Sequence, residues 1–307
     1  MQQEAYWKKQ KILVTGGSGF LGSNVVDLLR EKGVKNIEIP RREKQDLRNR
    51  EVCKEIVQNK TIIFHLAGNV GGIGYNREKG AEMLYDNLIM GVELMEAARK
   101  AKVKKFITVG TICSYPKKPK VPFREEELWN GYPEEITGPY GIVKKMLLVQ
   151  GQVYRRQYDF NAIFLLPTNL YGPNDHSTHV IAQLVQKFCE AKKRKRKYVT
   201  VWGTGKATRD FLYVRDAALG LILAAEKYNK PDPVNLGSGK ETSIRELTAV
   251  IAKACNYTGS IQWDKTKPEG QPRRLLDISR AKREFGFNPK TSLEEGIQKT
   301  VDWYLSE

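Results

Sequence analysis

The sequence predicts a doubly wound α/β fold, in which helices cover both faces of a parallel sheet and a smaller C-terminal lobe follows. Short apolar segments alternate with amphipathic helical segments over about the first 170 residues, which is typical of βαβ units. A glycine-rich turn lies between the first apolar segment and the first helix, and helical and loop segments dominate after Pro173.

The predicted elements of the sheet follow one another in chain order. Residues 11–16 form a short apolar strand that enters the glycine turn, and residues 19–33 form an amphipathic helix that ends at Gly33. Further strands are expected at 36–39, 61–68, 104–111 and 161–167, and helices at 81–101 and 137–158.

The C-terminal part has a different pattern. Residues 231–239 contain an isolated strand signal, and helices are expected to begin at the N-caps Ser243 and Ser292. We therefore predict a sheet domain over residues 1–173, with a returning strand near 233–237. Residues 174–307 are expected to form mostly the smaller lobe.

Composition and cysteine usage are those of a globular protein without a disulfide scaffold or a metal site. Of the 307 residues, 40% are hydrophobic and 28% are charged, which suits a sizeable core. No apolar run approaches the roughly 18 residues of a membrane span, and no apolar signal segment precedes the first strand. We expect a cytoplasmic protein with no membrane partner. The cysteines are scattered, at Cys53, Cys113, Cys189 and Cys255. All except Cys113 are expected to be buried small hydrophobes.

The formal net charge of +17 is the least ordinary feature of the composition. A basic surface could bind nucleic acid, and residues 192–197 are six consecutive Lys and Arg residues. No helix-turn-helix, zinc-finger or RNA-binding signature accompanies them. We interpret the run as a solvated loop, expect no nucleic-acid partner, and attribute part of the remaining charge to an anionic substrate.

The glycine turn indicates a dinucleotide. Gly16, Gly19 and Gly22 have G-x-x-G-x-x-G spacing between a strand and a helix. The first glycine allows the tight turn, the second lets the backbone approach a pyrophosphate, and the third lets helix and strand pack closely. The helix N-terminus favours the anion. The strand–turn–helix context makes the motif specific enough to predict a dinucleotide-binding domain.

The end of the second strand indicates which dinucleotide is bound. An acidic residue there would accept a hydrogen bond from the adenosine ribose and favour NAD, but this sequence has Arg41 and Arg42. Because a guanidinium can pair with a 2′-phosphate, we expect NADP(H), with Arg42 as the discriminating residue. Two surface arginines are the alternative interpretation. Asp46 is expected to accept from the adenine amino group.

Tyr140 and Lys144 indicate acid/base chemistry. They form Y-x-x-x-K, one helical turn apart and so on one face of the predicted helix. A lysine ammonium there would lower the pKa of the phenol and could also hold the nicotinamide ribose. Thr111 offers a hydroxyl at the C-terminal end of the preceding strand, where parallel sheets bind ligands.

Several segments together resemble the extended short-chain dehydrogenases/reductases: TGGSGFLG, FHLAG, the Y-x-x-x-K helix and PTNLYGP. More narrowly, HLAGNVGGI, GTICSYP, VWGTGKATRDFLYV and KPEGQPRRLLD are similar to the GDP-L-fucose synthases, which are GDP-4-keto-6-deoxy-D-mannose 3,5-epimerase-4-reductases. The resemblance implies a Rossmann fold with a smaller substrate-binding lobe. It also implies C3/C5 epimerisation of the sugar followed by reduction at C4 with NADPH.

The resemblance assigns proton exchange to Cys113 and His179, which match the cysteine after the active-site Ser/Thr and the histidine beyond the N-L-Y-G-P loop. A 4-keto sugar has acidified protons at C3 and C5, and a thiol and an imidazole both titrate near neutrality. Taken singly, a packed strand-end thiol and a solvated loop histidine are the ordinary alternatives. The expected catalytic set is Thr111, Cys113, Tyr140, Lys144 and His179.

The binding positions that the motifs and the resemblance imply fall into two groups. The cofactor group is Gly16, Ser18, Gly19, Phe20, Leu21, Gly22, Arg42, Asp46, Leu66, Ala67, Gly68, Val109, Gly110, Lys144, Pro167, Thr168, Asn169, Leu170 and His179. The sugar-nucleotide group is Lys187, Trp202, Arg209 and Glu269.

Departures from the family pattern leave the sugar open. Lys187 stands where an arginine is usual, Glu269 where an aspartate is usual and Thr111 where a serine is usual, and the loop 172–180 is shorter. A related 4-reductase or 4-epimerase for another nucleotide sugar is the nearest alternative, and a non-catalytic NADP-sensing protein is a more distant one. By fold analogy, the helices over 79–101 and 137–157 would form a homodimer.

Overall fold

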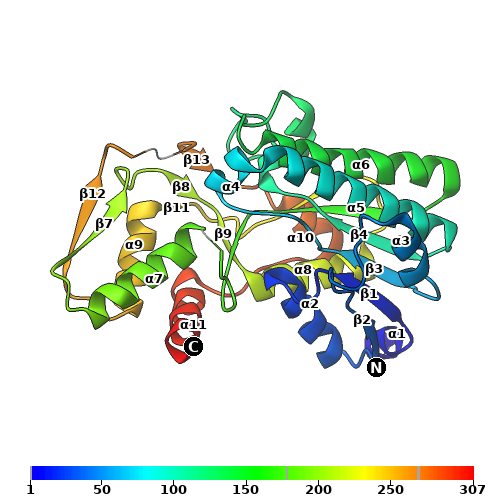
Figure 1. Ribbon diagram of the computed structural model, residues 1–307, viewed down its shortest axis with the longest axis horizontal. Coiled ribbons are helices and arrows are strands. Elements are labelled where there is room, and N and C mark those ends of the chain that lie inside the picture. The colour runs from blue at the N-terminus through cyan, green and yellow to red at the C-terminus, as the bar shows by residue number, and fades with distance from the viewer. Residues whose placement is uncertain (1, 178, 268–269) are drawn as a thin grey trace.

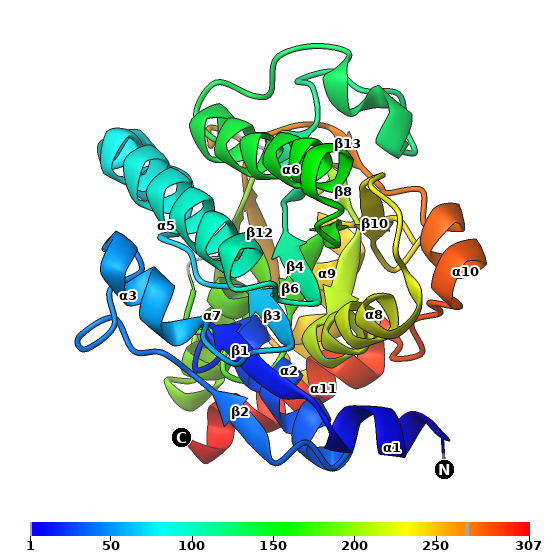
Figure 2. The same ribbon diagram turned by 90° about the vertical axis from the view of Figure 1, so that its right-hand side faces the viewer.

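A six-stranded parallel sheet forms the centre of the larger part of the molecule, in the order β10-β5-β4-β3-β1-β2 (Figures 1 and 2). The structure is a computed structural model that describes residues 2–177, 179–267 and 270–307. The strands are β1 (Lys11–Thr15), β2 (Asn36–Glu38), β3 (Ile62–His65), β4 (Lys105–Val109), β5 (Ala162–Pro167) and β10 (Val234–Leu236). Every pairing in this sheet is parallel, so the predicted doubly wound fold is confirmed.

Helices cover both faces of the sheet, which explains why β3, β4 and β5 are buried at every residue. One face packs against α2 (Phe20–Glu31), α8 (Val214–Lys227) and α10 (Ser279–Phe285). The other packs against α3 (Arg50–Ile56), α5 (Gly80–Lys100) and α6 (Gly138–Tyr158). The short α1 (Gln2–Lys8) buries Trp7 in the first of these layers.

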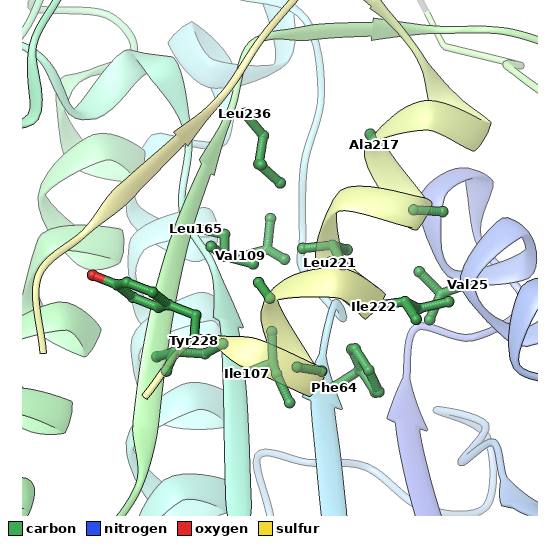
Figure 3. Close-up of a cluster of buried hydrophobic side chains, with 14 of the residues drawn as sticks. Val25, Phe64, Ile107, Val109, Leu165, Ala217, Leu221, Ile222, Tyr228 and Leu236 are labelled. Atoms are coloured by element: carbon green, nitrogen blue, oxygen red, sulfur yellow. The ribbon is translucent and has the colours of Figure 1, made fainter. Parts of the chain in front are cut away.

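The helix α8 is the centre of the first layer. Figure 3 shows Leu221 of this helix beside Val109 of β4, and Ile222 beside Val25 of α2; Leu236 of β10 belongs to the same cluster. Each fully buried side chain of this size contributes roughly 1.5–3 kcal/mol relative to its exposed state. This apolar contact holds the C-terminal half of the chain onto the sheet.

The sheet takes up more of the C-terminal half than the one returning strand that we expected. β10 pairs with β5 in the region expected for that strand, but α8 and α10 also pack on the sheet. The division of the chain at residue 173 therefore separates the two parts only approximately.

The smaller lobe has its own hydrophobic core. It is built from α7 (Val180–Lys193), α9 (Ile244–Ala254) and α11 (Leu293–Ser306), with β7 (Tyr198–Trp202) parallel to β12 (Ser260–Asp264). The predicted N-caps are confirmed: the hydroxyls of Ser243 and Ser292 accept from the backbone N–H of Glu246 and Glu295, both at 3.1 Å.

Short elements connect the lobe to the sheet. β6 (Asn169–Tyr171) pairs with β9 (Phe211–Tyr213), and β8 (Thr208–Arg209) lies between β11 (Thr242–Ser243) and β13 (Arg273–Arg274). α4 (Ile73–Glu78) and the 3₁₀ helices η1 (Ile112–Ser114) and η2 (Glu125–Trp129) complete the described elements.

The cysteines and the basic run behave largely as expected. Cys53, Cys189 and Cys255 are buried, whereas Cys113 is partly exposed. The sulfurs of Cys189 and Cys255 lie 3.3 Å apart, a proximity that their separation of 66 residues hides in the sequence. Residues 192–197 are exposed, from the last turn of α7 to the turn before β7. No helix in the described ranges is long and apolar enough to cross a membrane.

Candidate active site

Most of the expected cofactor residues follow the C-terminal ends of four neighbouring strands. β5, β4, β3 and β1 are adjacent in the sheet and parallel, so the loops after them meet at one edge. These loops hold four groups of residues: Gly16 to Gly22, Leu66 to Gly68, Val109 to Gly110, and Pro167 to Leu170.

The turn after β1 has the geometry of an anion cradle. Gly16 has φ +68°, and a Cβ there would lie 2.7 Å from the backbone nitrogen of Ala67. A Cβ at Gly22 would lie 2.0 Å from the carbonyl oxygen of Gly16. The helix α2 begins after Gly19, an N-cap without a side chain. Its first amides are therefore open to a ligand anion such as a pyrophosphate, and the loop fits a dinucleotide.

The basic segment after β2 contains an ion pair that the sequence analysis missed. Arg41 and Arg42 are exposed. Asp46 accepts two bonds from the Nε of Arg48, both at 3.0 Å, and one from its Nη2 at 2.6 Å. The hydrogen-bonded Arg48 side chain holds the pKa of Asp46 below its ordinary value. Arg48 also reaches Asp86 on α5 at 3.1 Å, so the carboxylate expected to meet adenine is oriented by a neighbour.

The end of β4 is packed directly against the start of α6. The hydroxyl of Thr111 accepts from the backbone N–H of Cys113 at 3.2 Å and caps η1. The hydroxyl of Ser114 donates to the carbonyl of Gly141 at 3.0 Å, and a Cβ at Gly141 would lie 2.4 Å from the Cys113 carbonyl oxygen. The structure thereby brings Thr111 and Cys113 close to Tyr140, the neighbour of Gly141.

Tyr140 and Lys144 lie on the same face of α6, as expected, but their electrostatics differ from our expectation. The Nζ of Lys144 lies 5.6 Å from the centroid of the Tyr140 ring. Burial, with a smaller electrostatic effect of Cys113, raises the pKa of Tyr140 above its ordinary value, and burial lowers the pKa of Lys144 to about 8. The expected lowering of the phenol pKa is therefore not found, because burial disfavours the charged phenolate.

The protonation of the Tyr140 phenol determines which reaction it can assist. A phenol with a raised pKa keeps its proton at neutral pH, and the protonated form is the one that can donate to a developing alkoxide. The geometry therefore suits a ketone reduction, in which this group acts as the acid.

A pocket lies beside Cys113. It is lined by Ile112, Cys113, Glu134 and Thr137 from the Cys113 side and by Gln271 and Arg274 from the C-terminal segment. The carboxylate of Glu134 is engaged by the backbone N–H groups of Ile136 and Thr137, both at 3.1 Å.

The loop after β5 is held by a buried acid that the sequence analysis did not single out. Thr168 and Asn169 donate to the carbonyl of Asp210, each at 3.0 Å. The Asp210 carboxylate accepts from the N–H of Ser238 at 2.8 Å and from its hydroxyl at 2.6 Å. Burial raises the pKa of Asp210 to about 6. The available signal was an aspartate between Arg209 and the apolar strand 211–213.

His179 occupies a different position from the other catalytic candidates. It is the exposed N-cap of α7, and its backbone N–H donates to the hydroxyl of Ser177 at 3.2 Å. Among the described residues, no hydrogen bond or ion pair joins it to Cys113 or Tyr140.

The sugar-nucleotide candidates lie on the smaller lobe. The Lys187 ammonium donates to the carbonyl of Thr200 at 3.2 Å, and Trp202 is 58% exposed at the end of β7. The Arg209 guanidinium donates to the carbonyl of Gln271 at 2.6 Å. Glu269 lies outside the described residues.

Comparisons with known proteins give a consistent result. A model of the NAD dependent epimerase/dehydratase family matches residues 12–237. GDP-L-fucose synthase 1 of Arabidopsis thaliana is 37% identical over 304 residues, covering 97% of this chain and 94% of the plant protein.

Two solved structures are also similar. A GDP-L-fucose synthetase from Naegleria fowleri bound to NADP has a TM-score of 0.87 and 28% identity, with 97% of this chain and 94% of that chain covered. A GDP-mannoheptose C4 reductase from Campylobacter jejuni with NADP bound has a TM-score of 0.89 and 26% identity, with coverages of 96% and 98%.

Proposed function

Because the chain belongs to the NAD dependent epimerase/dehydratase family, we propose that it converts GDP-4-keto-6-deoxy-D-mannose to GDP-L-fucose with NADPH. The arrangement of Thr111, Cys113, Tyr140 and Lys144 at the junction of β4 and α6 is the observation that carries this proposal. It supplies an acid for a ketone oxygen and, two residues after Thr111, a thiol for proton exchange. The 37% identity to a plant GDP-L-fucose synthase supports the choice of sugar.

Epimerisation comes first in the proposed reaction. The C4 ketone acidifies the protons at C3 and C5, so a base can remove each one to give an enolate. An acid then returns a proton to the opposite face, which inverts the centre. Cys113 and His179 are the proposed pair, because a thiol and an imidazole exchange protons near neutral pH. His179 caps α7 in a loop, so closure of that loop over the sugar is part of this proposal.

Reduction follows at C4. NADPH supplies the hydride when it is bound. Tyr140, whose phenol is protonated at neutral pH, donates a proton to the oxygen that becomes the C4 hydroxyl. In this proposal Thr111 would hydrogen-bond the same oxygen, and Lys144 would hold the nicotinamide ribose.

The proposed cofactor contacts come from the sheet edge. The turn at Gly16–Gly22 would receive the pyrophosphate on the open amides of α2, and Arg42 would pair with the 2′-phosphate. Asp46, oriented by Arg48, would accept from the adenine amino group. Solved relatives with NADP bound support the choice of cofactor.

The nucleotide of the substrate would lie on the smaller lobe. Trp202 offers an exposed ring on which a base can stack, and Arg209 offers a guanidinium for a diphosphate. Lys187 would add a point charge.

The second candidate is a 4-reductase for another GDP-sugar, which the likeness to a GDP-mannoheptose C4 reductase favours. The test is a panel of nucleotide 4-keto sugars in deuterium oxide, assayed for NADPH oxidation with product stereochemistry determined by NMR. The fucose assignment requires stoichiometric NADPH oxidation, deuterium at C3 and C5, and inversion at both. Reduction without deuterium at these centres would favour the 4-reductase, and turnover without net NADPH oxidation a 4-epimerase.

The variant Cys113→Ser sharpens the same experiment. A serine hydroxyl is far too weak an acid to replace a thiol with a reference pKa of about 8.5. We expect slower deuterium incorporation and a product that is partly uninverted, while reduction continues. Incorporation and inversion at the wild-type rate would remove Cys113 from the proton-transfer step.

The localisation, the assembly and the partners of the enzyme belong to the same proposal. We propose a cytoplasmic homodimer that associates through α5 and α6 and has neither a nucleic-acid nor a membrane partner. The two helices pack side by side on the outside of the sheet (Figure 1), which supports this choice of surface.

A further inference from the structure

One residue, Gln271, joins the smaller lobe to the loop that follows η1, the 3₁₀ helix that contains Cys113. The amide nitrogen of Gln271 donates to the carbonyl of Lys117 at 2.6 Å, and its amide oxygen accepts from the Nε of Arg274 at 2.5 Å. The backbone carbonyl of Gln271 accepts from the Nη1 of Arg209 at 2.6 Å. Three hydrogen bonds therefore meet at this residue: two join it to Lys117 and Arg209, which are distant in the sequence, and one joins it to Arg274, three residues along its own segment.

The three partners belong to different parts of the proposed site. Arg209 lies on β8 of the smaller lobe, where the diphosphate is proposed to bind. Lys117 lies in the loop after η1, four residues beyond Cys113. Arg274 lies on β13, which pairs with β8, and it lines the pocket beside Cys113.

The two ends of the loop after η1 are held differently. Farther along the chain, Phe123 is fixed by two backbone bonds to the C-terminal segment, from its N–H to Leu275 at 2.8 Å and from the N–H of Asp277 to its carbonyl at 2.9 Å. Nearer to Cys113, the carbonyl of Lys117 is held across this junction by the Gln271 side chain. The N–H of Lys117 also donates to the Tyr132 carbonyl at 2.9 Å, so the Gln271 side chain adds the contact that ties this end of the loop to the C-terminal segment.

We propose that Gln271 is a positioning residue, which couples Arg209 to the Cys113 loop and presents Arg274 to the pocket beside the thiol. The inference rests on the proposed function, because it treats Arg209 as a diphosphate contact and Cys113 as the proton-exchanging group. A diphosphate that draws the Arg209 guanidinium changes the hydrogen bond to the Gln271 carbonyl. That change reaches Lys117 through the same residue.

The reactivity of Cys113 toward iodoacetamide reports the loop position without needing any substrate. Cys53, Cys189 and Cys255 are at most 6% exposed, whereas Cys113 is half-buried, so alkylation of each cysteine can be followed separately by peptide mass spectrometry. Loss of one hydrogen bond typically changes a local equilibrium by roughly two- to tenfold. We expect Gln271→Met to alkylate at Cys113 faster than the wild type by about that factor.

Two further variants test whether the lost hydrogen bond to Lys117 causes the faster alkylation of Cys113. Gln271→Glu keeps an acceptor for Arg274 but loses the donor to Lys117, so it should alkylate as fast as Gln271→Met. Gln152→Met is the matched control. It removes an exposed hydrogen bond of 3.2 Å from the Gln152 side-chain amide, at a distant point on α6, to the Pro231 carbonyl. This variant should behave like the wild type. Wild-type alkylation rates in both Gln271 variants, with unchanged melting temperatures, would overturn the proposal.

Binding of GDP tests the coupling itself. Saturating GDP should change the Cys113 alkylation rate of the wild type and leave that of Gln271→Met unchanged, while calorimetry shows GDP bound to both. An equal response in both proteins would mean that GDP acts on Cys113 without Gln271, which contradicts the coupling.

Turnover separates this proposal from the proposed function. In Gln271→Met, deuterium exchange at C3 and C5 should fall several-fold at an unchanged KM for NADPH. If the wild type fails to turn over the GDP-4-keto sugar, the proposed function is wrong. The alkylation rates without nucleotide would still decide whether Gln271 holds the Cys113 loop.

Discussion

Two buried lysines illustrate how the same burial can support either stability or chemistry. Burial lowers the pKa of both Lys105 and Lys144 to about 8. The Lys105 ammonium donates to the carbonyls of Ala224 and Tyr228 at 3.2 and 2.6 Å and to the Asn229 side chain at 2.9 Å, so it satisfies the C-terminus of α8. Lys144 donates no hydrogen bond to any described residue. A buried charge without a hydrogen-bond partner is destabilising, and such charges are often found at functional sites.

We expect Lys144→Met to raise the melting temperature at pH 7 and to abolish reduction. A pKa lowered from 10.5 to about 8 means that the unfolded chain binds more protons than the folded one between these pH values. The free energy of unfolding of the wild type therefore rises with pH across this window, and at pH 7 the charge costs on the order of 3 kcal/mol. Lys105→Met, which orphans three acceptors, should instead lose a few kcal/mol. Thermal melts of both variants at pH 7 and pH 9.5 check this, and destabilisation by Lys144→Met would contradict it.

Tyr140→Phe should abolish reduction and leave NADPH binding nearly intact. The phenol donates its proton in the transition state, and loss of a general acid typically costs roughly 10²–10⁴-fold in rate. Single-turnover NADPH oxidation measures the loss, and NADPH fluorescence measures binding. A variant that keeps most of the wild-type rate would exclude Tyr140 as the acid.

At the scale of elements, the strands of the sheet and the long helices α2, α5 and α6 before residue 173 were predictable from their periodicity, whereas the short helices α1, α3 and α4 and the strand β6 were not predicted. β1, β3, β4 and β5 all lie within the ranges expected from the sequence. The helix α8 was not singled out, because an apolar segment such as ALGLILAA does not say which surface it will bury. The ion pair of Asp46 with Arg48 depends on side-chain rotamers, which a pattern does not contain.

The packing of the glycine turn against α2 predicts a sharp difference between two substitutions. In Gly22→Ala the new Cβ would lie 2.0 Å from the Gly16 carbonyl oxygen, so the helix must move away from the turn. We expect a loss of roughly 1–3 kcal/mol in stability and loss of NADPH binding. Gly80→Ala, at the start of α5 with nothing within 4 Å of its Cβ, is the control and should be neutral or slightly stabilising. Thermal melts and NADPH titration test both, and wild-type affinity in Gly22→Ala would rule out the turn as the pyrophosphate cradle.

At the scale of the whole molecule, the candidate site lies where the sheet domain meets the smaller lobe. The sequence could indicate Tyr140, Lys144 and the glycine turn because each belongs to one local motif. Gln271 and Asp210 were not singled out, because their roles depend on contacts between segments far apart in the chain. His179 shows the converse: its motif was recognised, but the folded chain leaves it as an exposed helix cap.

The uncovered face of α5 and α6 leads to a prediction about assembly. Leu84, Leu88 and Val92 follow one another at intervals of four along α5 and are exposed or half-buried, as are Ile142 and Met146 on α6. Met146 is 49% exposed and Leu84 is 38% exposed. An apolar stripe shared by two packed helices is the kind of surface that a twofold dimer buries.

We expect Met146→Glu and Leu84→Glu to weaken the proposed dimer without unfolding the protomer. A carboxylate forced into an apolar interface costs several kcal/mol, and each 1.4 kcal/mol raises the dissociation constant tenfold, so a loss of roughly 10²-fold or more is expected. Light scattering coupled to size-exclusion chromatography over a dilution series gives the mass directly. Leu305→Glu, at a residue that is 62% exposed near the end of α11, is the matched control, because it places the same charge on a surface outside the stripe. A dimer that survives both substitutions, or that Leu305→Glu breaks instead, would place the interface on another surface; a monomeric wild type would show that this stripe does not support a dimer.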